Sequence, residues 1–121
     1  MADVPTAVQE LLNAMNREFA QQLPGKIRLV EKLWKVLLKK YNYEDFMTLH
    51  LCVHSLAGSS ASFGNAPVGN AARVLEQYLD KFLDAHEPGL NPFNAAQRAQ
   101  ISSYVESLKT LVAEAEHLVA N

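Results

Sequence analysis

Hydrophobic residues recur at three- and four-residue steps along nearly the whole chain, which is the spacing of one face of an α-helix. The breaks in this pattern fall where Pro, Gly and Asn cluster, as at Pro24-Gly25 and Gly64-Asn65, because these residues end helices or begin new ones. Asn94 is a candidate N-cap for the last helix. The pattern predicts helices over 6–22, 24–41, 43–63, 67–86 and 95–119.

Each expected helix is hydrophobic on one stripe only, and such a stripe has to be buried against another element. Short connections between successive helices favour antiparallel neighbours. The sequence therefore predicts an all-α fold, an antiparallel four-helix bundle with an additional N-terminal helix over 6–22 that covers the bundle. No internal repeat or linker divides the chain, so we expect one domain over 1–121.

The overall composition narrows the class of protein. The 121 residues carry 11 Lys and Arg against 13 Asp and Glu, so the formal net charge is −2 and no basic footprint indicates nucleic acid binding. No apolar run approaches the ~20 residues of a membrane span, and the first residues lack the pattern of a secretory signal. The single cysteine, Cys52, cannot form an internal disulfide, which fits a reducing compartment. We expect a cytoplasmic protein that binds neither nucleic acid nor membrane.

The segment from His54 to Gly64 departs from the helical pattern, because it places Gly58 and several serines inside a predicted helix. Glycine costs about 1 kcal/mol relative to Ala in a helix interior, so its presence indicates that space is needed there. Gly58 lies one helical turn from His54 and would leave the surface beside the imidazole uncovered. His54 follows the inward-facing Val53 and should lie at the edge of the apolar stripe or outside it. An exposed imidazole with a free ring nitrogen is a nucleophile that can attack a phosphoryl group.

The same segment resembles a known family. The residues His54-Ser55-Leu56-x-Gly58-Ser59-Ser60-x-x-x-Gly64 are similar to the signature of the histidine-containing phosphotransfer (HPt) domain. The preceding segments agree in order, with Phe19…Leu23-Pro24 before an amphipathic helix and the short connection Tyr41-Asn42-Tyr43 before the histidine helix. Leu75-Glu76 matches the Leu-Glu that the family commonly has on its next helix. The resemblance extends over about residues 19–119.

The resemblance implies a role in multistep His-Asp phosphorelays. Domains of this family are four-helix bundles whose exposed histidine takes a phosphoryl group from an aspartate of one receiver domain and passes it to another. His54 would then be the phosphorylated nucleophile, most simply through Nε2, and Gly64 would end its helix. Six surrounding residues are expected to contact the phosphoryl group or the receiver: His50, Ala57, Gly58, Ser59, Ser60 and Ala61. For Ser59 and Ser60, packing of the helix is the alternative.

The resemblance also implies partners and cofactors. The partners would be receiver domains of response regulators or of hybrid sensor histidine kinases, and we expect the chain itself to be a monomer without kinase activity of its own. We expect no bound cofactor or metal, because the Mg²⁺ and the acidic pocket that stabilise the transferring phosphoryl group would belong to the receiver.

One position departs from the family pattern. The family usually carries Lys three residues after the histidine, where it helps to neutralise the phosphoryl group, and this chain has Ala57. Arg28, Lys35 or Arg73 from a neighbouring helix are alternative sources of positive charge. The departure leaves a second function open, an adaptor that keeps the HPt bundle and binds receiver or kinase domains without carrying phosphate.

Other interpretations of these residues are structural. A helical histidine such as His54 is commonly a partly buried residue bonded to a backbone carbonyl. His50 and His54 are also spaced as two metal ligands on one helix face, but no Glu follows His50 and the sequence identifies no third ligand. The lysines of the second predicted helix form either a solvated face or a surface that steers an acidic receiver. They are Lys32, Lys35, Lys39 and Lys40.

Overall fold

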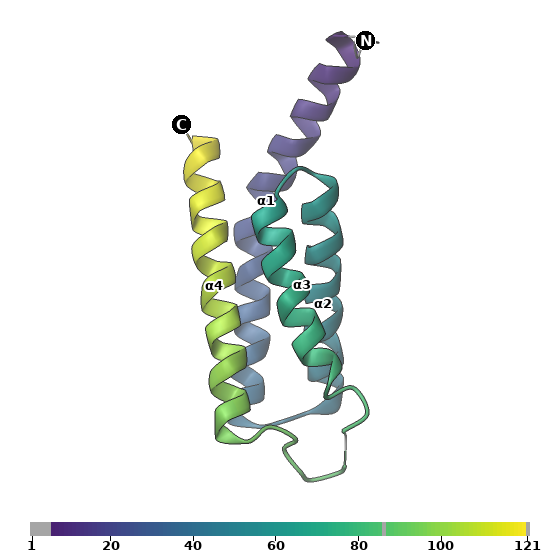
Figure 1. The fold of residues 1–121 in the computed structure, drawn as a ribbon, viewed down its shortest axis with the longest axis vertical. Coiled ribbons are helices and arrows are strands. Elements are labelled where there is room, and N and C mark those ends of the chain that lie inside the picture. Colours follow the sequence, from purple (N-terminus) through teal and green to yellow (C-terminus); the bar gives the residue numbers. More distant parts are fainter. Residues whose placement is uncertain (1–5, 86, 121) are drawn as a thin grey trace.

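Four helices form the bundle in a computed structural model, which describes residues 6–85 and 87–120, with side chains as far as 116. The helices are α1 (Thr6–Lys39), α2 (Tyr43–Ser62), α3 (Ala66–Asp80) and α4 (Ala95–Ala120). They alternate in direction, and each packs against two others, α1 and α3 both lying between α2 and α4 (Figure 1). The all-α antiparallel bundle is therefore confirmed, with no strand in the described residues. Within that same part of the chain, no helix is long and apolar enough to cross a membrane.

The prediction of a separate, additional N-terminal helix is wrong. Residues 6–39 form one helix of 34 residues with Pro24 inside it. Proline removes one backbone donor, which would have bonded the carbonyl of Ala20, and favours a bend. Leu23 and Ile27 are buried on either side of Pro24, so packing against the bundle carries the helix through it. The N-terminal part leans away past the end of the bundle (Figure 1) and covers no other helix, since residues 6–18 are all exposed.

Asparagine side chains define the starts of the other helices. Asn42 accepts a hydrogen bond from the Asp45 amide, and Asn65 accepts one from the Val68 amide. At α4 the bonds are reciprocal, because Asn94 Oδ1 accepts from the Gln97 amide at 2.8 Å and Gln97 Oε1 accepts from the Asn94 amide at 2.9 Å. Each cap satisfies amides that have no partner within the first turn. The predicted N-cap at Asn94 is confirmed.

The helix predicted over 67–86 ends earlier, at Asp80. The chain then continues in tight turns in which the Phe82 amide bonds the Leu79 carbonyl at 2.9 Å. These turns place the Phe82 ring against Phe93, with ring centroids 4.8 Å apart. A hydrophobic contact at the lower end of the bundle therefore replaces the last turns of the expected helix.

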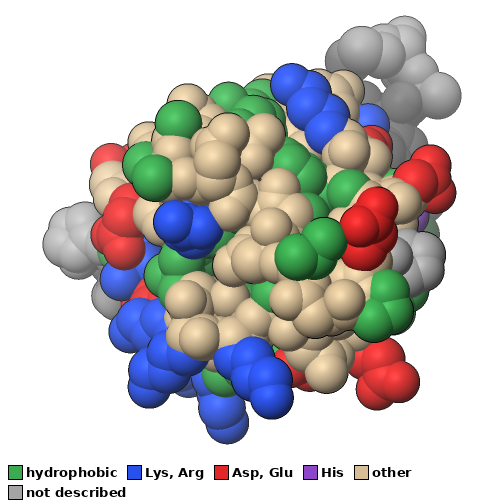
Figure 2. All heavy atoms as spheres, turned by 90° about the horizontal axis from the view of Figure 1, so that it is seen from below, with side chains coloured by type: hydrophobic (Ala, Val, Ile, Leu, Met, Phe, Trp, Pro, Cys, Tyr) green, Lys and Arg blue, Asp and Glu red, His purple; other side chains and the backbone are tan. Residues whose placement is uncertain are grey.

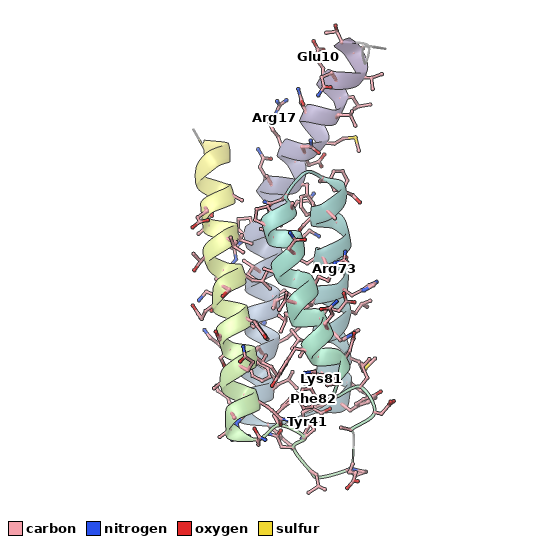
Figure 3. The ribbon with its side chains drawn as sticks, in the orientation of Figure 1. Glu10, Arg17, Tyr41, Arg73, Lys81 and Phe82 are labelled. Carbon is pink, nitrogen blue, oxygen red and sulfur yellow. The ribbon has the colours of Figure 1, made fainter. Side chains whose placement is uncertain are left out.

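Aromatic rings close that end of the core. Phe93, in the loop before α4, is buried and contacts the rings of Trp34, Phe46 and Tyr41 as well as Phe82. Figure 3 shows Tyr41 and Phe82 at this lower end. The Trp34 indole donates a hydrogen bond to Ser102 Oγ at 2.9 Å, which joins α1 to α4. The lower ends of α1 and α2 are thereby packed against the loop before α4, and the candidate site lies further along α2, on the edge that it shares with α3.

Candidate functional site

His54 lies on the solvent-facing side of α2, next to α3. Its side chain is 65% exposed, and its Nδ1 is hydrogen-bonded to a carboxylate oxygen of Glu76 on α3, whose side chain is 16% exposed. A carboxylate only accepts hydrogen bonds, so the imidazole hydrogen is on Nδ1. Nε2 is then the nitrogen with a free lone pair, and it has no protein hydrogen-bond partner in the described residues. The alternative of a buried histidine bonded to a backbone carbonyl is wrong.

His50 forms a second pair of the same kind one turn earlier on α2. Its Nε2 lies 2.6 Å from Asp80 Oδ1, and its side chain is only 17% exposed. The sequence predicted that His50 contacts the phosphoryl group or the receiver, whereas its side chain is mostly buried and its Nε2 is bonded to Asp80 of α3. His50 therefore ties α2 to α3 and offers little surface to a receiver.

The surface around the His54 imidazole is open and partly apolar. A Cβ added at Gly58 would meet no atom within 4 Å, so the approach to His54 is clear on that side. Ser59 is half-buried and Ala61 is exposed, which leaves both accessible. Leu51 is 64% exposed and Met47 is 37% exposed on the same outward side of α2. Large exposed apolar side chains beside a nucleophile are suited to docking another protein.

Two residues expected to contact a partner are instead inside the bundle. Ala57 is 2% exposed and Ser60 is fully buried, with no hydrogen-bond partner for its Oγ. Both face α3, where a Cβ at Gly69 would lie only 3.3 Å from the Ala57 carbonyl oxygen and 3.4 Å from Ser60 Cβ. Their small side chains let the two helices approach closely. The prediction that Ala57 and Ser60 contact a receiver directly is therefore wrong. Both residues pack α2 against α3.

The end of α2 follows from Gly64. This residue has φ of 82°, in the left-handed region that favours glycine, and the Asn65 amide bonds back to the Ser60 carbonyl at 2.8 Å. The Phe63 amide also bonds the Ser59 carbonyl, at 2.9 Å. The bond from Asn65 to Ser60 across a left-handed glycine is the 6→1 bond of a Schellman motif, whereas the bond from Phe63 is the last regular bond of the helix. The predicted helix end at Gly64 is confirmed.

The lysine-rich face of α1 lies on the other side of the bundle from His54. Its Glu31 carboxylate bonds Lys109 of α4 and Lys35, each at 2.8 Å, whereas His54 is on the edge between α2 and α3. These cations, Lys109 first, lower the pKa of Glu31 to about 2. Figure 2 shows Lys and Arg side chains gathered on one side of the lower end of the bundle. Any steering by these charges would act at long range and not by contact at the site.

The remaining candidate groups do not converge on His54. No three His, Cys, Asp or Glu side chains in the described parts of the chain are placed to hold a metal ion. Cys52 lies on the α1 side of α2, beside a cavity of about 260 Å³ that is lined also by Lys26, Leu29, Leu51, Ser55 and Leu56. Burial raises the pKa of the Cys52 thiol, which disfavours the reactive thiolate.

Sequence reasoning missed two features of this site. Glu76 was noted only as part of a family pattern, and its hydrogen bond to His54 depends on the register of two helices, which the spacing within one helix does not show. Leu51 and Met47 were detectable, because they precede His54 by three and seven residues and so share its helix face.

Comparisons with known proteins identify the family of this chain. A stretch of 71 residues, 59% of this chain, is 35% identical to part of a protein described as the highly reducing polyketide synthase valA of Aspergillus terreus. The chain spans only 3% of the length of that protein. No solved structure gives a significant match. The family model described as Hpt domain matches residues 2–119. The chain therefore belongs to the Hpt domain family, whose members carry out histidine phosphotransfer in two-component phosphorelay signalling and interact with receiver domains.

Proposed function

We propose that His54 is a phosphorelay intermediate that accepts a phosphoryl group from the phosphorylated aspartate of one receiver domain and passes it to another. The observation that carries this proposal is the exposed imidazole, held through Nδ1 by Glu76, one helical turn from the uncovered backbone at Gly58. A nucleophile presented in this way needs no further group from its own chain to begin the attack.

The transfer is a single displacement at phosphorus. The Nε2 lone pair forms the N–P bond while the P–O bond to the receiver aspartate breaks, and the aspartate leaves as a carboxylate. The imidazole keeps its Nδ1 hydrogen and becomes positively charged, and the Glu76 carboxylate offsets that charge. The reverse displacement delivers the phosphoryl group to a second receiver. The receiver would supply Mg²⁺ and the acidic pocket, because the described surface around His54 offers no metal-binding cluster.

The test is phosphoryl transfer from a panel of phosphorylated receiver domains to the wild-type chain and to His54→Gln. We expect an acid-labile, base-stable phosphoramidate on the wild type that is absent from His54→Gln. The His50→Gln variant should still be labelled, since the Nε2 of His50 is directed to Asp80. Label that persists in His54→Gln would contradict the proposal.

An adaptor without phosphate is the second candidate, and Ala57 at the position of the family lysine favours it. The exposed Leu51 and Met47 would provide the docking surface in either case. Both functions predict receiver binding, so binding alone does not separate them. Binding of a receiver at micromolar concentrations with no label on His54 would establish the adaptor.

A further inference from the structure

A phosphoryl group on His54 would enter a surface with negative charge already present. The Glu76 carboxylate bonds the same imidazole, and Asp80 lies one turn further along α3. Ala57 supplies no positive charge from α2. A phosphoryl dianion beside a carboxylate is destabilised unless a cation lies near it. The following inference rests on the proposed function, because it concerns the phosphorylated form of His54.

The register of α2 against α3 identifies the residue that lies level with position 57. His50 pairs with Asp80, and His54 pairs with Glu76, so four residues forward on α2 correspond to four residues back on α3. At the other end of this seam, a Cβ at Gly69 would lie 3.2 Å from the Ala61 amide nitrogen. The residue numbers of these three pairs have the same sum, and Gly69 also packs against Ala57 and Ser60. By that sum, Arg73 lies level with Ala57 along the helix axes, on the exposed side of the seam.

Arg73 has the placement that a phosphoryl-binding residue needs. It is an exposed residue of α3 that lies between Gly69, which packs against α2, and Glu76, which bonds His54. Figure 3 shows Arg73 on the side of the bundle that α2 and α3 form, away from α4. It is three residues from Glu76, which is about 4.5 Å along the helix axis, within reach of a long flexible side chain.

The other candidate cations are placed elsewhere. Arg28 and Lys35 line a groove on α1 together with Glu31, which is bonded to α4. Lys26 lies with Cys52 on the α1 side of α2, whereas the imidazole of His54 is directed to α3. Among the alternatives that the sequence left open, Arg73 alone is on the seam that carries His54.

We propose that the guanidinium of Arg73 binds the phosphoryl oxygens of phosphorylated His54 and takes the place of the lysine that this chain lacks at position 57. Arginine offers a planar set of N–H donors that matches a phosphoryl group, and it stays charged at all physiological pH values. No bond is made or broken by Arg73, which stabilises the phosphorylated state over the free imidazole.

The experiment uses phosphoramidate, a small phosphodonor that acts without a partner protein, and follows the phosphohistidine by ³¹P NMR as a function of pH. A nearby cation favours the dianion, so loss of Arg73 should raise the pKa of the phosphoryl group. We expect Arg73→Ala to raise its proton affinity about two- to fivefold, as for a solvent-exposed ion pair. Arg28→Ala removes the same charge from an exposed position on α1 and should match the wild type, and Arg73→Lys should keep most of the effect.

A second readout is the equilibrium with a phosphorylated receiver domain, which should shift two- to fivefold toward the receiver in Arg73→Ala. If Arg73→Ala forms phosphohistidine normally and its titration curve is the same as that of the wild type, the role of Arg73 is overturned and the proposed function stays intact. Absence of any phosphohistidine on the wild type would overturn both. Circular dichroism of each variant checks that the exposed substitution leaves the bundle folded.

Discussion

The same substitution at two glycines should change stability in opposite directions. Gly58 is an exposed helix-interior residue, and a Cβ there meets nothing within 4 Å. Alanine is about 0.8–1 kcal/mol more favourable than glycine in a helix interior, so Gly58→Ala should raise the free energy of unfolding by nearly that amount.

Gly69→Ala places its Cβ against α2 instead. The nearest atoms are the Ala61 amide nitrogen at 3.2 Å and the Ala57 carbonyl oxygen at 3.3 Å, which are backbone atoms of a packed helix and cannot rotate away. Overpacking of this kind costs about 1–3 kcal/mol, from which the gain in helix propensity is subtracted. We expect Gly69→Ala to lower the free energy of unfolding by about 1 kcal/mol.

Urea unfolding followed by far-UV circular dichroism measures both variants against the wild type. In a thermal melt of a 121-residue domain, the midpoint temperature should move by about 4 °C per kcal/mol, upward for Gly58→Ala and downward for Gly69→Ala. A Gly69→Ala variant as stable as Gly58→Ala would refute the close approach of α2 and α3. That result would also remove the evidence for the register of α2 against α3, from which the level of Arg73 beside Ala57 is inferred.

Three further predictions concern single side chains. Glu76→Gln keeps a hydrogen-bond acceptor for His54 but loses the charge, so it should slow phosphoryl transfer about fivefold, measured with the same receiver as the wild type. Ser60→Ala removes a buried hydroxyl without a partner and should stabilise the chain by about 1 kcal/mol in urea unfolding, with transfer unchanged because Ser60 is buried. Glu31 has its pKa lowered from 4.5 to about 2, so its pairing with Lys109 stabilises the fold above pH 4.5, and this contribution is lost as the pH falls toward 2. In Glu31→Gln, the free energy of unfolding should therefore fall less steeply than in the wild type as the pH is lowered below 4.5. The same dependence on pH in both proteins would contradict the pairing.

Local signals in the sequence were sufficient for some elements. The helix over 43–63 was predicted to within one residue of α2, because Asn42 and Gly64 act on the backbone beside them. The start of α4 was predicted from Asn94 for the same reason. His54 and Gly58 were recognised from their spacing, which one helix determines alone.

Long-range packing decided the rest. Pro24 is a local signal for a break, and the burial of Leu23 and Ile27 against the bundle outweighs it. The burial of Ala57 and Ser60 depends on how closely α3 approaches α2. Gly69, twelve residues from Ala57, sets that distance. The bond between His54 and Glu76 likewise depends on the register of two helices, which no pattern within one helix contains.

The long α1 helix has a consequence for how the protein opens and closes in solution. It runs as one helix from Thr6 to Lys39, with only the bond that Pro24 cannot donate missing, but its burial begins only at Phe19. Amide hydrogens of an unpacked helix exchange with solvent through fraying, at little free-energy cost, whereas packed amides exchange only when the whole domain unfolds. One uninterrupted helix should therefore contain two exchange regimes that meet near Phe19. The boundary of the cooperative folding unit then follows the burial of side chains and crosses the middle of a secondary-structure element.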